Sequence, residues 1–271
     1  MDTSRWLKIT GGACLLLGAA GCETQTEARP QEKAGTAPVA GAPAEKQPAA
    51  ENKRKPVGKN VYFEIQGEQR RVVISATVCL REGQLEGLLT KKGTKEHEYI
   101  LVMDADAKLV HAALIGAGAK AGSPVRFEPK YAPAHGTVIK VLVRYTNKDG
   151  KTVTHPAQEW VRDVRTKKAM VHDWVFGGSR FVNDPEDKDK PPYYLANQGD
   201  VICCINMPDA MLDLPIKNPN TDPGLGDRVY EAFTDRIPKE GTWVEIILEP
   251  VPDKKGDEKP AEKSEEKKSD A

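Results

Sequence analysis

Aromatic side chains are confined to one stretch of this 271-residue chain, and this confinement limits where the chain can fold. Apart from Trp6, every aromatic residue lies within residues 57–251. A domain must bury apolar surface to offset the conformational entropy that is lost on folding. Residues 57–251 are numerous enough to build a hydrophobic core, so we predict the globular domain there.

The segments on either side of this domain have no means of building a core. Residues 22–56 are mainly Ala, Pro, Gly, Glu, Gln and Lys, and residues 252–271 alternate Lys with Asp and Glu. Such compositions are typical of disordered chains. We predict a flexible tether at 22–56, which as a random coil would span about 30 Å. We also predict a disordered charged tail at 252–271.

The first 22 residues have the pattern of a bacterial lipoprotein signal. Arg5 and Lys8 supply positive charge, a short apolar run follows, and small residues lead into Cys22. This run is shorter than the roughly 20 apolar residues that a spanning helix needs. We predict a signal peptide at residues 1–21 and a fatty-acyl anchor, such as palmitate, on the thiol of Cys22. Cleavage at an ordinary Ala-x-Ala-like site, with Cys22 incidental, is the alternative.

The predicted anchor places the protein in the cell envelope, on a membrane face outside the cytoplasm. Glu23 follows Cys22 in place of the Asp that often retains lipoproteins at the inner membrane, so the outer membrane is favoured. The 40 basic and 40 acidic residues balance, and no overall charge attracts nucleic acid. We expect the membrane itself as one partner, through the lipid, and an envelope protein or ligand as another.

Apolar runs in the domain are short and bounded by turn residues, which is typical of strands. They do not alternate regularly with helices, which disfavours a parallel βαβ sheet. We predict a mainly β (α+β) fold: an antiparallel sandwich or partly open barrel with one or two short packed helices. The expected hairpins are 61–65 with 71–80, 138–145 with 151–154, and 193–196 with 201–205; further strands are 99–103, 174–176, 181–182 and 242–248, and the helices are 107–117 and 227–234.

Reactive residue types are densest between Cys79 and His111. His97 and Glu98 immediately precede the predicted strand 99–103, and His111 lies in the predicted helix that follows. If this helix folds back on the strand, the two imidazoles meet beside a carboxylate, a set that suits a divalent metal such as zinc. The spacing matches no established metal signature. A metal or acid–base site of Glu86, His97, Glu98 and His111 therefore stands beside the alternative of structural histidines.

Three thiols remain in the predicted mature domain: Cys79, Cys203 and Cys204. The two neighbours lie in a strand-like run, so their side chains point to opposite faces and only one of them can meet Cys79. Export permits a disulfide, and we consider a Cys79–Cys203 bond. Free thiols buried among apolar side chains are the favoured interpretation.

Several short motifs together resemble bacterial YdjY-domain proteins. They spread over most of residues 72–248 and comprise Val78–Gly83 with Leu85-Glu86, Gly93–Glu98, His111–Leu114 with Gly116-Ala117, Trp174–Ser179 and Asp209–Pro215. The resemblance implies a domain type and directs attention to Glu86 and His97; it implies no reaction. Some members are described as ferredoxin-like, but three available thiols cannot supply the four-Cys ligation of an ordinary iron–sulfur cluster.

Two functions fit these patterns. The first is a non-enzymatic lipoprotein whose β-rich domain, without a cofactor, binds a protein or an envelope ligand from the end of its tether. The second is a metal-dependent or acid–base site built around Glu86, His97, Glu98 and His111. The anchor and the tether favour the first.

Overall fold

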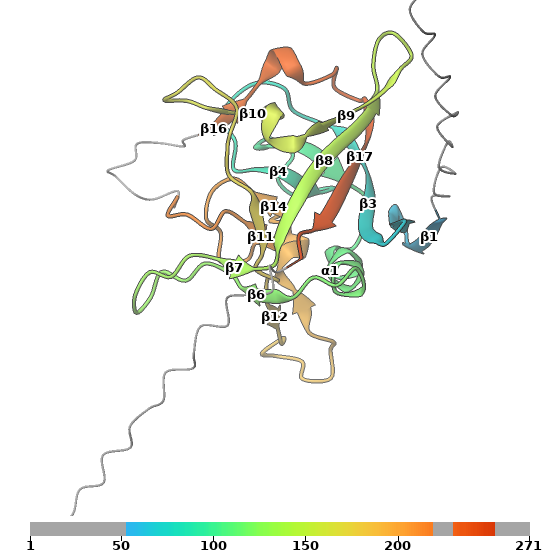
Figure 1. The fold of residues 1–271 in the computed structure, drawn as a ribbon. Coiled ribbons are helices and arrows are strands. Elements are labelled where there is room, and N and C mark those ends of the chain that lie inside the picture. Colours follow the sequence, from blue (N-terminus) through green and yellow to red (C-terminus); the bar gives the residue numbers. More distant parts are fainter. Residues whose placement is uncertain (1–52, 219–229, 253–271) are drawn as a thin grey trace, which may run out of the picture. The chain divides into compact units, whose positions relative to one another are not determined.

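The computed structural model describes residues 53–218 and 230–252, all of which belong to one compact unit of the chain, Pro48–Ala271. Figure 1 shows long strands wrapped around a core, with a helix at one end of the strands.

Eight strands close into a barrel. They pair in the order β3-β17-β8-β11-β15-β14-β4-β5, and β5 pairs back with β3. The pairs β4–β5 and β14–β15 are parallel, and the other six pairs are antiparallel. Closure leaves the ring without a free edge. The strands are β3 (Gln69–Val78), β4 (Gly87–Lys91), β5 (Tyr99–Met103), β8 (Val138–Thr146), β11 (Trp174–Phe176), β14 (Ile202–Cys203), β15 (Leu212–Asp213) and β17 (Trp243–Pro250).

The remaining strands flank the ring or form small two-stranded sheets. β1 (Lys53–Gly58) and β2 (Val61–Gln66) continue the sheet outward from β3, and β9 (Thr152–Pro156) pairs with β8. The small sheets are β6 (Ala121–Ser123) with β7 (His135–Gly136), β10 (Val161–Asp163) with β16 (Tyr230–Ala232), and β12 (Phe181–Val182) with β13 (Tyr193–Tyr194). Single 3-10 turns are η1 (Ala157–Trp160), η2 (Leu195–Gln198) and η3 (Thr234–Arg236).

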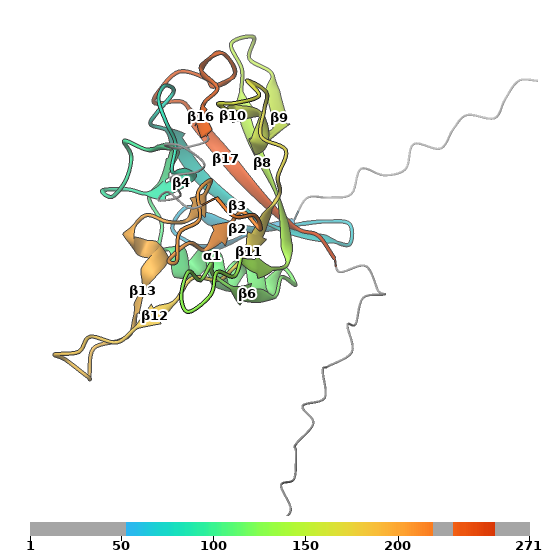
Figure 2. The same ribbon diagram turned by 90° about the vertical axis from the view of Figure 1, so that its left-hand side faces the viewer.

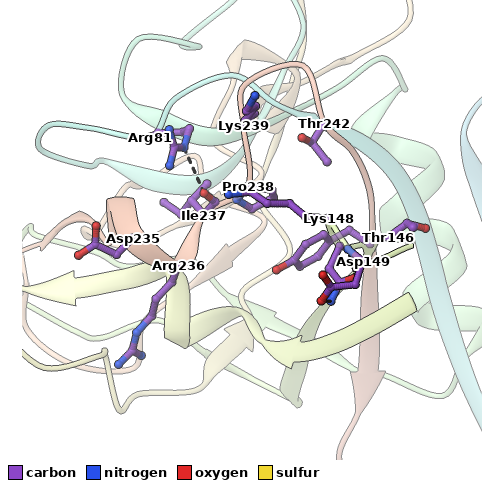
Figure 3. Close-up of a pocket in the computed structure, with 12 residues that line it drawn as sticks. Arg81, Thr146, Lys148, Asp149, Asp235, Arg236, Ile237, Pro238, Lys239 and Thr242 are labelled. Atoms are coloured by element: carbon purple, nitrogen blue, oxygen red, sulfur yellow. Dashed lines mark hydrogen bonds between the residues drawn. The ribbon is translucent and has the colours of Figure 1, made fainter. Parts of the chain in front are cut away.

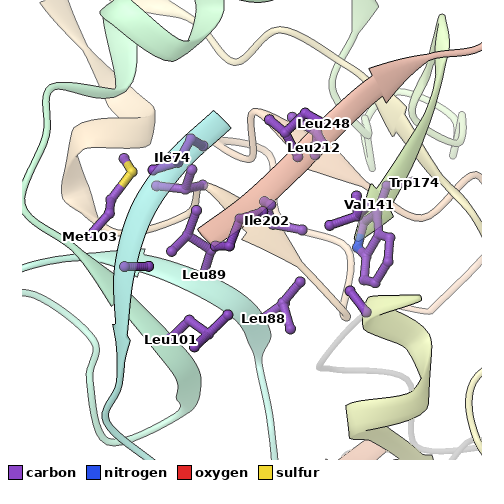
Figure 4. Packing of buried hydrophobic residues seen from close by; sticks show 14 of the residues in the cluster. Ile74, Leu88, Leu89, Leu101, Met103, Val141, Trp174, Ile202, Leu212 and Leu248 are labelled. Carbon is purple, nitrogen blue, oxygen red and sulfur yellow. The ribbon is translucent and has the colours of Figure 1, made fainter. Parts of the chain in front are cut away.

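The core fills the ring because neighbouring strands bring apolar residues into register. Val61, Ile74, Ile246 and Val143 lie opposite one another across four strands, and all four are fully buried. Figure 4 shows side chains from both sides of the ring, such as Leu89 and Trp174, meeting in this core. The predicted mainly β fold with a short helix is confirmed, and its barrel is closed.

The helix α1 (Ala107–Gly116) forms at the predicted place. Asp106 caps it by accepting a hydrogen bond from Lys108 N at 2.9 Å. Val110 and Leu114 are fully buried in the core, and the helix packs on β1, β2 and β3. In both ribbon views, α1 lies at the opposite end of the barrel from η3 and the β8–β9 turn (Figures 1 and 2).

Most predicted strands are confirmed, including the hairpins β2–β3 and β8–β9. The hairpin predicted from 193–196 and 201–205 is wrong: residues 193–194 pair with 181–182, whereas 202–203 pair with β4 and β15. The helix predicted at 227–234 is also wrong in its described part, since Tyr230–Ala232 is a strand. β1 begins at Lys53, four residues before the predicted start of the domain.

Candidate functional site

The structure brings together three of the four residues predicted to form a metal or acid–base site: Glu86 contacts Glu98, and the exposed His97 lies at the edge of this pair. Glu86 and Glu98 each precede one strand of the parallel pair β4–β5, where Gly87 lies opposite Tyr99. A Cβ atom on Gly87 would lie 2.1 Å from the Tyr99 ring, so this close pairing requires glycine. The two carboxyl groups are hydrogen-bonded to each other. Burial raises the pKa of Glu86 above its ordinary value, the nearby Lys95 opposes this shift, and Glu98 adds to it.

Lys95 links this carboxyl pair to Asp200. Its Nζ lies 3.3 Å from Glu86 Oε2 and 2.9 Å from Asp200 Oδ1. Burial alone would lower the pKa of Lys95, but Asp200 and Glu86 raise it, so the ammonium stays charged. Asp200 also accepts a 2.8 Å hydrogen bond from the Tyr99 hydroxyl. The ammonium group of Lys95 therefore already occupies the position between the carboxylates of Glu86 and Asp200.

The histidines lie apart from this cluster or at its edge. The side chain of His97 is 74% exposed, with Nε2 3.8 Å from Glu98 Oε2. His111 Nδ1 lies 2.9 Å from the hydroxyl of Tyr194, which donates to the Gly178 carbonyl at 3.0 Å, so Nδ1 carries the donating proton. Burial lowers the pKa of His111, and the ring is neutral and structural.

The described residues do not assemble the metal site that was predicted from the sequence. Within residues 53–218 and 230–252, no three His, Cys, Asp or Glu side chains are placed to hold a metal ion. His111 points to Tyr194 on another segment, and Lys95 takes the place beside Glu86 and Asp200 that a cation would need.

The three cysteines of the described chain are free thiols, as the sequence favoured, and the alternative Cys79–Cys203 disulfide is not formed. Cys79 Sγ is directed at the carbonyl of Tyr99 at 3.1 Å, whereas Cys203 Sγ lies 3.4 Å from the Tyr99 hydroxyl. The two sulfurs thus contact opposite ends of one residue. Burial raises the pKa of Cys79 to about 12 and that of Cys203 well above its ordinary value, so both are unreactive thiols.

Another candidate site is a groove that Figure 3 shows from close by. Its β8–β9 side lies at the end of the barrel opposite α1 (Figures 1 and 2). Its volume is about 600 Å³, which is within the range of small-ligand sites. Residues 145–149, which run from the end of β8 into the β8–β9 turn, form one side, and residues 235–239 with Thr242 form another. The remaining lining residue is Arg81, which follows β3.

Arg81 is held rigidly at this groove. Its Nε donates to the Ile237 carbonyl at 3.1 Å and its second guanidinium nitrogen donates to the Thr234 carbonyl at 3.0 Å. In return, the Thr234 hydroxyl donates to the Arg81 carbonyl at 2.8 Å. Arg236 stacks on the ring of Phe233, with the guanidinium carbon 4.0 Å from its centroid. The lining is therefore pre-organised on this side.

The groove is basic. Four cationic side chains are among the described residues that line it: Arg81, Lys148, Arg236 and Lys239. Their charge is offset by only two carboxylates in this lining, those of Asp149 and Asp235. The side chains of Lys148 and Lys239 are exposed to solvent. A surplus of cations that includes a fixed guanidinium suits an anionic ligand.

Sequence reasoning singled out none of the groove residues as a site, although Arg81 lies in one of the quoted motifs. The segments that form the groove are far apart in the chain and meet only because β17 pairs with both β3 and β8.

The predicted signal peptide at 1–21, the anchor residue Cys22, most of the tether and nearly all of the tail lie outside the described residues. In the described part, no helix combines the length and the apolar character needed to cross a membrane.

Comparison with family models gives one assignment. The model described as the YdjY domain matches residues 63–249, which is more than half of the chain and spans the whole barrel ring apart from the last residue of β17. Comparison with curated proteins and with solved structures gave no match.

Proposed function

The chain belongs to the YdjY domain family, and from that premise we propose that it is a lipid-anchored protein of the cell envelope whose barrel domain binds an anionic ligand. The signal-like run ending at Cys22 supports the anchor, and Glu23 favours the outer membrane. The Pro- and Ala-rich segment after Cys22 supports a tether that lets the domain reach away from the bilayer.

The observation that carries the binding proposal is the basic groove of Figure 3. It combines a volume of about 600 Å³ with the hydrogen-bonded Arg81 and two exposed lysines, Lys148 and Lys239, so a ligand meets several cationic donors. A ligand with several negative charges, whether an envelope polymer or an acidic protein segment, fits this lining. No catalytic group is needed for this role.

In-cell crosslinking tests the groove. A photo-reactive amino acid replaces Thr146, which is exposed at the groove, in the full anchored chain. We expect a specific adduct that disappears when Lys148→Glu and Lys239→Glu are combined, because the reversal repels an anion. Lys188→Glu, on the exposed tip between β12 and β13, is the matched control and leaves the adduct unchanged. An adduct that survives the double reversal contradicts the proposal.

The Glu86–Glu98 pair supports a second candidate, general acid–base chemistry. A proton shared between two carboxyls, with the pKa of Glu86 raised by burial, is an arrangement that enzymes use. Chromogenic ester, phosphoester and glycoside substrates distinguish the two candidates. Turnover by the purified chain that is abolished by Glu86→Gln supports catalysis, whereas absence of turnover together with the crosslink supports binding.

A further inference from the structure

The outer face of the sheet carries an exposed indole where β17 begins. Trp243 is 56% exposed, while the other tryptophans of the described residues, Trp160 and Trp174, are buried. Trp243 lies directly opposite Thr77 of β3, which in turn lies opposite Val102 of β5. The paired strands of the closed barrel therefore fix the backbone beneath the indole of Trp243. The apolar surface of this indole stays in contact with water.

A groove of about 470 Å³ runs beside Trp243. Ser75 and Thr77 contribute hydroxyl groups from β3, and Glu96 and Asp104 contribute carboxylates from the two ends of the segment that contains β5. The groove thus joins an aromatic surface to hydrogen-bonding groups that are half-exposed or exposed.

Glu96 is fixed by the backbone. Its carboxylate accepts hydrogen bonds from Gly93 N at 2.5 Å and Thr94 N at 2.9 Å. These bonds lower the pKa of Glu96, so its carboxylate is ionised and its remaining lone pairs can accept further hydrogen bonds.

The second carboxylate is balanced by a lysine. Asp104 Oδ2 lies 2.8 Å from Lys59 Nζ, and this hydrogen bond lowers the pKa of Asp104. Lys92 also lines the groove. The charges of Glu96 and Asp104 are thus offset by Lys59 and Lys92, and neither a cation nor an anion is favoured by the local field.

We propose that the Trp243 groove binds a neutral saccharide. A sugar ring has an apolar C–H face that packs on an indole, and hydroxyl groups that donate to carboxylates and accept from lysine. An organic cation would require an uncompensated negative charge beside the indole. An apolar peptide would remove water from the carboxylates of Glu96 and Asp104 and offer no hydrogen bond to their remaining lone pairs.

This site is separate from the basic groove of Figure 3, and the inference does not depend on the anionic ligand. The two can be tested independently, because Lys148 and Lys239 do not line the Trp243 groove.

The test uses the purified full chain and an array of neutral oligosaccharides built from glucose, mannose and N-acetylglucosamine, with polyglutamate and polylysine as charged probes. We expect at least one oligosaccharide to bind and neither charged probe to compete. Binding shifts the fluorescence of the exposed indole. Trp243→Ala should weaken this affinity at least about tenfold, as for a central aromatic contact.

Tyr193→Ala is the matched control, since Tyr193 is an exposed aromatic residue on β13. It should leave saccharide binding unchanged, and thermal unfolding should show both variants folded. The lysine reversals should also leave saccharide binding unchanged. The proposal is overturned if no member of the array binds, or if Trp243→Ala binds as tightly as the original chain.

Discussion

Asp213 is fully buried on β15, and only one of its carboxylate oxygens is satisfied within the described part of the chain. Oδ1 accepts hydrogen bonds from Leu214 N at 2.7 Å and Asn206 Nδ2 at 3.2 Å. Oδ2 has no hydrogen-bond partner among the described residues. Burial raises the pKa of Asp213 to about 7, although both bonds to Oδ1 oppose the shift.

This raised pKa predicts a loss of stability with rising pH. An unfolded Asp releases its proton near pH 4, whereas folded Asp213 keeps it until about pH 7. The contribution of Asp213 to the free energy of unfolding is therefore complete below about pH 4. Between about pH 4 and about pH 7 this contribution falls by up to about 1.4 kcal/mol per pH unit, and above about pH 7 it no longer changes.

Asp213→Asn removes this contribution. Urea unfolding should show that the variant gains stability relative to the original chain between pH 5 and pH 8. Asp187→Asn, an exposed change on the tip between β12 and β13, should show no such gain. Equal pH profiles for the original chain and the Asp213 variant would contradict this account.

The candidate site could be predicted only in part at the level of residues. The concentration of Glu86, Glu98 and His97 in sequence correctly indicated a polar cluster, because all of them lie next to β4 or β5. The partners Lys95 and Asp200 were missed, since Asp200 joins only when β14 pairs with β4. His111 was misplaced because the helix orients it toward Tyr194.

At the level of elements, β2, β3, β8 and β17 carry an ion network on the face opposite the core. Arg71 bonds Glu64 at 2.5 Å and Glu249 at 3.0 Å, and Arg144 bonds Glu245 at 2.6 Å. Burial opposes ionisation of Glu64, but Arg71 and Arg144 outweigh it and hold the pKa of Glu64 below its ordinary value. The network ties four neighbouring strands together.

Arg71→Met tests this network. The change leaves Glu64 and Glu249 buried without their main cation, and we expect the free energy of unfolding to fall by about 3 kcal/mol. Lys140→Met is the control: its ammonium is 3.9 Å from Glu249 and its side chain is 56% exposed, so the expected loss is below about 1 kcal/mol. Similar losses in the two variants would show that the network contributes little.

Strands with long apolar or alternating runs could be predicted from sequence, as β3, β5 and β17 show. The two-residue strands could not, because β14 and β15 are defined by which strands they meet and not by their own pattern. The wrong hairpin at 193–205 has this cause. Adjacent runs with a turn between them predict local pairing, but η2 leads the chain from β13, which pairs with β12 outside the ring, to β14 in the ring.

At the level of the whole molecule, the basic groove and the proposed anchor belong to different parts of the chain. The barrel ring is complete within residues 69–250, and the first described strand begins at Lys53. The proposed tether can therefore be changed before Pro48, where the compact unit begins, without removing any strand of residues 53–218 and 230–252.

Deleting residues 23–47 should abolish the crosslink from position 146 in cells and leave thermal unfolding unchanged. The physical reason is the length of the tether, because a domain held close to the bilayer samples a smaller volume around its anchor and meets its ligand less often. A Gly/Ser segment of equal length in place of 23–47 is the control and should restore the crosslink. A crosslink that persists in the shortened chain would show that reach is not required.

The mass of the mature amino terminus tests the central claim most directly. We predict that the protein purified from membranes begins at Cys22 and carries a diacylglycerol on its thiol, and that Cys22→Ala is released into the soluble extracytoplasmic fraction. A membrane-derived chain that begins at an unmodified residue, or one that retains residues 1–21 in the cytosol, would contradict the account.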